Sequence, residues 1–383
     1  MMRRLGLYIH IPFCKKKCRY CDFLSFPAKE TLIPQYVKVL CREIRSLEKN
    51  YEGFSYAAHT IETVYFGGGT PSLLSGEEVK ELLRTVRECF RLSKTAEITM
   101  EVNPGTVTKE KFEAYFEAGV NRLSIGLQSA NDNELKRLGR IHDYARFSDC
   151  FQLARKAGFQ NINVDVMTAL PGQTMESLKK TLEKVISLKA EHISAYSLIL
   201  EEGTVLYEEF KGNPDLIMEK ETERSMYELV KKLLSENGYE QYEISNFAKP
   251  GYESSHNSAY WNRTDYLGVG LGASGLLSNV RYRNETDFEK YLMCDNPVRE
   301  KQPVSIPEQM EEFLFLGLRM RKGVSKGDFC ACFHKELHEV YGETINKLKK
   351  QELIFENEEI ICLTDKGIDY GNYVFSEFLL SEI

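Results

Sequence analysis

The chain has 383 residues, of which 42% are hydrophobic and 28% charged, as is typical of a folded soluble protein. Its net charge of −7 gives no support for binding to nucleic acid or to an anionic membrane surface. No apolar run approaches the length of a membrane span, and ten cysteines without an export signal favour a reducing cytoplasm and metal chemistry over disulfides.

Short runs rich in β-branched and aromatic residues alternate with longer stretches of helical period in the first 200 residues. Six strands are predicted, at residues 5–12, 60–66, 97–102, 122–127, 162–170 and 192–198. Helices are expected near residues 33–48 and 76–90 and at 133–138 and 144–157. Two more are expected after the third and fifth strands, ending at residues 118 and 188. Because parallel strands need crossover connections, this alternation predicts a parallel sheet with helices outside it.

Chemically capable residues stand near the carboxyl ends of all six predicted strands, where sites lie in both open α/β sheets and barrels. They are Cys14, the glycines at 67–69, Glu101, Gln128, Asp165 and the stretch 196–200. Six such ends suggest a ring around one ligand. We therefore predict an α/β fold with a partial (β/α)6 barrel, in preference to an open doubly wound sheet.

The sequence changes in character after residue 210. We predict a barrel over residues 1–210, a linking region over 211–300 and a smaller α+β, winged-helix-like domain over 301–383. The predicted elements are a helix at 217–236, a segment at 239–245, helices at 307–320 and 333–348, a hairpin at 352–363 and a terminal helix. The acidic hairpin tip argues against DNA binding by this domain.

Cys14, Cys18 and Cys21 have the spacing C-x3-C-x2-C. Three thiolates can hold a [4Fe–4S] cluster while one iron keeps no protein ligand. The alternative is a structural zinc site with His10 or a distant residue as the fourth ligand, but the chain has no second paired ligand set. The cluster is therefore favoured. Most of the other cysteines are expected to be buried as small hydrophobic residues.

Gly67, Gly68 and Gly69 precede Thr70 and Pro71 in a turn after the second predicted strand. Glycines allow bare backbone to approach a ligand, although an ordinary strand-to-helix turn would look similar. The run lacks the lysine of a phosphate-binding loop and does not continue as a dinucleotide fingerprint.

The cysteines, this turn and the acidic residue closing the next strand together resemble the radical S-adenosylmethionine (SAM) superfamily. Segments 8–14, 65–72, 101–104, 122–129 and 170–174 are similar to the oxygen-independent coproporphyrinogen III oxidase family. The resemblance implies that Cys14, Cys18 and Cys21 hold the cluster. It implies that S-adenosylmethionine is contacted by Tyr8, Tyr20, Gly68, Gly69, Thr70, Glu101, Gln128, Arg140 and Asp165. The alternatives are capping of strand–helix junctions for Glu101 and Asp165, and a surface ion pair for Arg140.

Two departures separate the chain from the decarboxylating oxidases. Phe23 stands where that family has a fourth cysteine, and the first strand starts too early for the N-terminal extension that helps to enclose substrate. Both departures resemble the related HemW-type haem chaperones, as does the His-Asn-x-x-Tyr-Trp motif from His256 to Trp261. A histidine beside aromatic residues can supply an axial nitrogen to haem iron. A buried histidine packed on an aromatic cluster would have the same sequence signature.

Cys330 and Cys332 are further candidate haem ligands, although core packing is the favoured interpretation for each.

The resemblance therefore implies a haem chaperone that carries a [4Fe–4S] cluster and S-adenosylmethionine, binds haem and transfers it to acceptor proteins. The alternative is an oxygen-independent coproporphyrinogen III oxidase, which decarboxylates propionates by radical chemistry. A zinc-stabilised binding module is the third hypothesis. Whether the protein is an enzyme stays open at this point, with the departures favouring no oxidase activity. A cytoplasmic location, no nucleic-acid partner and no integral membrane span are expected.

Overall fold

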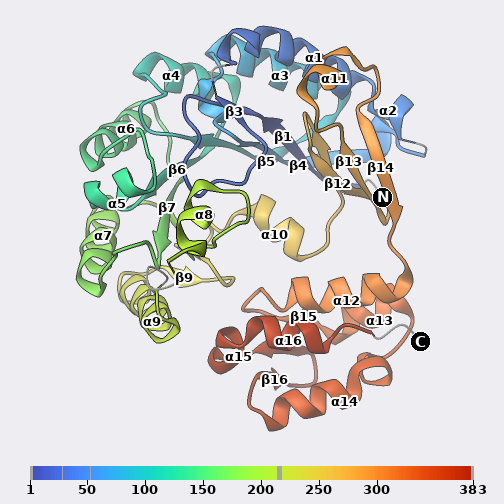
Figure 1. The fold of residues 1–383 in the computed structure, drawn as a ribbon. Helices are drawn as coiled ribbons and strands as arrows, with labels where there is room; N and C mark the ends of the chain where they lie inside the picture. Colours follow the sequence, from blue (N-terminus) through green and yellow to red (C-terminus); the bar gives the residue numbers. More distant parts are fainter. Residues whose placement is uncertain (1–2, 28, 52, 214–217, 381–383) are drawn as a thin grey trace.

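A computed structural model describes residues 3–27, 29–51, 53–213 and 218–380. A curved sheet dominates it, with the strand order β14-β13-β12-β11-β1-β4-β5-β6-β7-β8-β10-β9 (Figure 1). The strands from β11 to β8 in this order pair in parallel. They are β11 (Tyr266–Val269), β1 (Arg3–Ile11), β4 (His59–Gly68), β5 (Arg91–Val102), β6 (Arg122–Gln128), β7 (Ile162–Thr168) and β8 (His192–Ser197).

Helices cover the convex face of this sheet (Figure 1). They are α1 (Ile33–Arg45), α3 (Gly76–Cys89), α4 (Lys109–Ala118), α6 (Tyr144–Lys156), α7 (Met175–Ser187) and α9 (Lys220–Glu236). The alternation along β6 decides what faces them, since successive strand residues point to opposite faces. Leu123, Ile125 and Leu127 join the apolar core, whereas Ser124 and the residues in phase with it face the hollow of the barrel. The predicted α/β partial barrel is confirmed.

Antiparallel strands that the sequence analysis did not identify extend both edges of the sheet. They are β9 (Glu240–Gln241), β10 (Asn246–Ala248), β12 (Ser274–Leu277), β13 (Val280–Asn284) and β14 (Val298–Pro303). The region 211–300 therefore contributes to the same sheet as the barrel. These strands are only two to six residues long, too short for a period-two pattern to mark them clearly in the sequence.

Some predicted boundaries also differ. β5 begins at Arg91, whereas the sequence analysis placed its start at residue 97. The first half of the strand is mostly polar and therefore gave no strand signal. The first predicted helix divides into α1 and the short α2 (Leu47–Asn50). The segment at 239–245, for which no type of element was predicted, contains β9 and is followed by β10. The predicted helix start at Ile217 lies outside the described residues.

The C-terminal part forms a smaller module with an apolar core of its own. It contains α12 (Ile306–Gly317), β15 (Val324–Ser325), α13 (Lys326–Phe333), α14 (Leu337–Lys350), β16 (Ile354–Glu356), β17 (Ile360–Leu363), α15 (Asp365–Asp369) and α16 (Gly371–Glu377). The helices and hairpin agree with a winged-helix-like order, but α13 was missed. None of the helices in the described part of the chain is long and apolar enough to cross a membrane.

A short helix, α10 (Ser255–Trp261), lies between the barrel and the C-terminal module (Figure 1). The Glu97 carboxylate on β5 accepts hydrogen bonds from the backbone N–H groups of Ser255 and His256, at 2.9 and 3.1 Å. These are N–H groups of the first helical turn, which no carbonyl within the helix can satisfy. The barrel therefore fixes the start of this helix.

Glu43 on α1 is a buried carboxyl whose titration should be visible in the stability of the fold. It accepts hydrogen bonds from the Tyr291 hydroxyl at 2.6 Å and from the Asn284 amide at 2.7 Å. Burial raises its pKa from 4.5 to about 7 despite these donors. A raised pKa means that the folded state holds the proton more tightly than the unfolded chain does.

We expect the free energy contributed by this proton to be fully present below pH 4.5 and lost as pH rises through about 7. A shift of the Glu43 pKa from 4.5 to about 7 corresponds to about 3 kcal/mol in the free energy of unfolding. Urea unfolding from pH 4.5 to 8 should therefore show the stability of Glu43→Gln relative to wild type increasing with pH. A difference that stays constant over this range would contradict the assignment.

Candidate functional site

The cysteine loop connects two short strands, β2 (Phe13–Cys14) and β3 (Phe26–Pro27), which pair in parallel and hold its two ends together. Within the loop, the Arg19 N–H donates to the carbonyl of Leu138 at 3.0 Å, which ties the loop to the end of α5 (Asp132–Arg137). Cys14, Cys18 and Cys21 all line one cavity at the carboxyl ends of the parallel strands.

The strand ends bring most of the predicted cofactor residues to that cavity. Those lining it are Tyr20, Gly68, Gly69, Thr70, Glu101, Gln128, Arg140 and Asp165. Tyr8 is the exception among the residues predicted to contact S-adenosylmethionine. Its hydroxyl meets Nδ1 of His10 at 3.0 Å, and its ring stacks on Tyr65 behind the cavity wall.

The glycine turn passes too close to the cysteine loop for any side chain. A Cβ at Gly69 would lie 2.7 Å from the carbonyl oxygen of Phe13 and 3.1 Å from the sulfur of Cys14. Gly68 has a φ of +112°, which other residues rarely adopt, and a Cβ there would meet the His10 ring at 2.5 Å. The bare backbone therefore forms the wall next to the cysteines.

Two carboxyls face the cavity from neighbouring parts of the barrel. Glu101 accepts hydrogen bonds from the Tyr65 hydroxyl at 2.9 Å and from the backbone N–H of Gly68 at 3.2 Å. Burial, with a contribution from the charge of Asp165, raises the pKa of Glu101 to about 7. Burial also raises the pKa of Asp165, although Asn163 donates to it at 2.7 Å. A cationic ligand would favour the ionised form of both groups.

Arg140 supplies a positive charge to the same cavity. Its guanidinium donates to the carbonyl oxygen of Gly126 at 2.9 Å and to the side chain of Asn103 at 3.3 Å. A further N–H group lies 3.6 Å from the sulfur of Cys18. A surface ion pair, the alternative considered for this residue, is not what the structure shows. A fixed guanidinium beside the cysteines suits a ligand carboxylate.

The three thiols fit an iron–sulfur cluster better than a single ion. Among the residues that the structure describes, no three His, Cys, Asp or Glu side chains converge closely enough to hold one metal ion, as a zinc site requires. Cys14, Cys18 and Cys21 line one cavity, and in a [4Fe–4S] cluster each of their sulfurs would bind a different iron. Burial, followed by the neighbouring thiols Cys18 and Cys14, raises the pKa of Cys21 to about 11, and binding to iron would remove that proton.

Further lining residues were missed from the sequence. They are Tyr65, Asn103 and Ser124; Tyr196, from the strand end expected at 196–200, also lines the cavity. The Tyr196 hydroxyl donates to Gln128 at 3.3 Å, and Ser124 donates to Asp165 at 3.2 Å. Tyr65 and Ser124 are in phase with inward-facing residues of their strands, so the period of two carried the signal that could have identified them.

His256 does not line this cavity and is 2% exposed. Its Nδ1 lies 2.7 Å from the Thr63 hydroxyl and its Nε2 lies 2.9 Å from the Tyr260 hydroxyl, so both ring nitrogens are occupied. The ring stacks on Tyr65, and burial, with the charge of Arg122, lowers its pKa to about 3. This geometry does not support the haem contact expected of His256; it corresponds to a buried histidine within an aromatic cluster.

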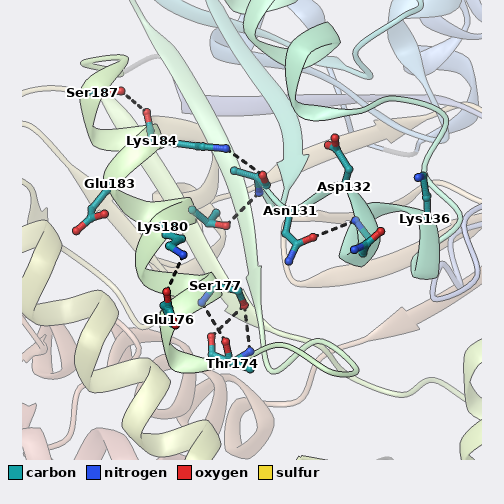
Figure 2. A pocket seen from close by; sticks show the side chains of 13 residues that line it. Asn131, Asp132, Lys136, Thr174, Glu176, Ser177, Lys180, Glu183, Lys184 and Ser187 are labelled. Atoms are coloured by element: carbon teal, nitrogen blue, oxygen red, sulfur yellow. Dashed lines mark hydrogen bonds and ion pairs between the residues drawn. The ribbon is translucent and has the colours of Figure 1, made fainter.

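A surface hollow of about 940 Å³ is a different feature (Figure 2). It lies between α5 and α7, and none of the predicted site residues lines it. Its polar groups largely bond one another: Lys180 pairs with Glu176 at 2.6 Å, and Ser177 with Thr174. Exposed i,i+4 ion pairs of this kind are typical of a solvated helix surface.

Comparison with known proteins extends over nearly the whole chain. The Radical SAM superfamily model matches residues 8–185, and the HemN C-terminal domain matches residues 304–370. The protein named heme chaperone HemW from Lactococcus lactis is 39% identical over 98% of this chain and 97% of its own length. The proteins of that name from Bacillus subtilis and Escherichia coli are 38% and 37% identical over at least 97% of both chains. The chain belongs to the HemW family of radical SAM proteins.

The structure of this chain also resembles that of coproporphyrinogen III oxidase (HemN) from Escherichia coli. The TM-score is 0.85, over 99% of this chain and 90% of that one. Sequence identity is only 22%, so this likeness concerns the fold. The predicted family and fold class are thus confirmed together.

Proposed function

We propose that this protein is a cytoplasmic haem chaperone, which binds haem and delivers it to acceptor proteins while carrying a [4Fe–4S] cluster and S-adenosylmethionine. The observation that carries this proposal is full-length similarity to proteins named heme chaperone HemW, at up to 39% identity. The similarity includes both the barrel and the C-terminal module, so it is not limited to the cofactor cavity.

The cavity residues support the cofactor part of the proposal. Cys14, Cys18 and Cys21 would hold the cluster, and its open iron would bind the amino acid end of S-adenosylmethionine. Arg140 would pair with the ligand carboxylate and the two carboxylates would face its sulfonium and hydroxyl groups. When reduced, such a cluster supplies the electron for homolytic cleavage of the sulfonium.

Phe23 supports a chaperone rather than an oxidase. Its side chain lines the rim of the cavity and is 62% exposed, at the position where the resemblance places a fourth cysteine in the oxidases. An exposed phenylalanine offers neither a ligand nor a proton donor to a substrate held there.

An oxidase remains the second candidate function, because most of the residues expected for radical chemistry line the cavity. Three cysteines, the glycine turn, both carboxyls and Arg140 line one space. Anaerobic incubation with coproporphyrinogen III, a reductant and S-adenosylmethionine separates the candidates. We expect no vinyl products, and their formation would favour the oxidase.

Transfer kinetics test the chaperone function. The haem-loaded protein is mixed with increasing concentrations of an apo-haem protein. We expect a transfer rate that rises with acceptor concentration, since direct delivery requires a complex between donor and acceptor. A rate independent of acceptor concentration would mean simple release of haem and would contradict the proposal.

Replacement of Gly69 by alanine tests the bare-backbone wall. The added Cβ would meet backbone oxygens at 2.7 and 3.0 Å, so the turn or the cysteine loop must shift. We expect S-adenosylmethionine affinity to fall more than tenfold in calorimetry of the cluster-loaded protein. Gly212→Ala is a matched control, because Gly212, like Gly69, does not have a positive φ, and a Cβ there meets nothing within 4 Å. Unchanged affinity in Gly69→Ala would show that the turn is not part of the site.

A further inference from the structure

A series of buried hydrogen bonds begins at Asp165, in the wall of the cysteine and glycine cavity. Asn163 lies two residues earlier on β7 and therefore points to the same face of the sheet. Its amide nitrogen donates to the Asp165 carboxylate at 2.7 Å and to the Ser124 hydroxyl at 2.8 Å. Asn163 is 2% exposed and does not line the cavity. A residue that a ligand in the cavity would not touch thus supports the carboxylate.

The orientation of the Asn163 amide decides whether a donor or an acceptor faces Asp165. Its oxygen lies on the other side, 2.6 Å from Nδ1 of His192 and 3.1 Å from the Ser194 hydroxyl. That hydroxyl has a single proton and lies closer to the amide oxygen of Asn246, at 2.6 Å. His192 is therefore the donor that fixes the Asn163 amide.

The position of the proton on His192 follows from its neighbours. The ring is fully buried, and burial, followed by the charge of Arg122, lowers its pKa well below the usual value, so it is neutral and carries one proton. That proton lies on Nδ1, because the Asn163 oxygen can only accept. Nε2 then accepts from the Tyr242 hydroxyl at 2.8 Å, and this oxygen accepts from the N–H of Ser254 at 3.2 Å. Each bond in the series therefore has a defined direction.

We propose that His192 is a positioning residue for the S-adenosylmethionine site, acting through Asn163 on the carboxylate of Asp165. The inference rests on the proposed cofactor function and adds to it a residue outside the cavity. With the donor of His192 in place, the Asn163 amide offers its nitrogen to Asp165 and favours the ionised carboxylate. Without that donor the amide can turn, and its oxygen would then repel the carboxylate that faces the ligand.

Two substitutions at position 192 separate this role from simple packing. Asparagine places its amide nitrogen where histidine has Nδ1, so His192→Asn keeps a donor for Asn163 but leaves space where the ring was. Leucine fills more of that space and has no donor. Positioning therefore predicts that the asparagine variant binds S-adenosylmethionine better than the leucine variant, whereas packing predicts the reverse order.

Calorimetry of the full-length, cluster-loaded protein with S-adenosylmethionine measures this order. We expect His192→Leu to lose about tenfold in affinity and His192→Asn to stay within about threefold of wild type. His59→Leu is the control. His59 is 3% exposed and bonded to the Ser55 carbonyl at 2.8 Å, but it does not line the cavity. This variant should bind as wild type does, even if its thermal stability falls.

Nitrogen NMR of histidine-labelled wild type gives a second measurement, which does not depend on the folding of His192→Leu. The His192 ring, assigned by its absence from His192→Asn, should carry its proton on Nδ1 and none on Nε2 at neutral pH. A proton on Nε2 alone would overturn the inference, because no donor would then face Asn163.

Asp165→Asn distinguishes a failure of the inference from a failure of the cofactor site. If wild type binds no S-adenosylmethionine, or if Asp165→Asn binds it as tightly as wild type, the proposed site fails and the role of His192 fails with it. If Asp165→Asn weakens binding but His192→Leu does not, the inference alone is overturned. Equal losses in His192→Leu and His192→Asn would also overturn it alone.

Discussion

Replacing Cys14, Cys18 and Cys21 together by serine should abolish cluster assembly. Wild type should take up about four irons and four sulfides per chain on anaerobic reconstitution, and the triple variant almost none. The reason is chemical: a serine hydroxyl does not replace a thiolate on iron at neutral pH, and none of the other residues lining the cavity carries sulfur. Iron and sulfide analysis, with the visible absorption spectrum, measures the effect.

Cys89→Ser is the control, because Cys89 lies at the end of α3 and does not line the cavity. It should assemble a full cluster. The triple variant should keep the circular dichroism of wild type, since the loop lies outside the main sheet and is joined to it by few bonds. A cluster retained by the triple variant would refute the assignment of these ligands.

Glu101→Gln should weaken S-adenosylmethionine binding about 10- to 100-fold at pH 8, the effect expected for the loss of a charged partner. At this pH the wild-type carboxyl is ionised, because its pKa is raised by burial only to about 7. Below about pH 7 it takes up a proton and no longer attracts the sulfonium. Wild-type affinity should therefore fall as pH decreases from 8 to 6, by at most about tenfold per unit.

The variant should show a flatter pH profile, since the glutamine does not titrate. Glu43→Gln is a matched control: burial raises its pKa to about 7 as well, but it does not line the cavity. Its affinity and pH profile should equal those of wild type. Equal profiles for wild type and Glu101→Gln would exclude a role for this carboxylate in binding.

The sequence was sufficient for the barrel and for most of the cavity. Both follow from local patterns: strands of regular period place their last residues at one edge, so Glu101, Gln128 and Asp165 meet without any knowledge of distant contacts. The flanking strands β9, β10 and β12 to β14 could not be found in this way. They are defined by pairing with existing edges rather than by their own composition.

The environment of His256 could not be predicted from the sequence either, because it depends on residues far away in the chain. Its partner Thr63 is 193 positions away, and Glu97, which caps its helix, is 159 positions away. A motif of six residues contains no information about such contacts. For the same reason the sequence pattern did not show that Cys332 is exposed and Cys330 only half-buried, although core packing was favoured for both.

Haem titration of the cluster-loaded wild-type protein tests the chaperone function most directly. The account predicts a saturable Soret shift at one haem per chain, with the haem then passed to an apo-acceptor. No shift at stoichiometric haem, together with vinyl products from coproporphyrinogen III, would contradict it.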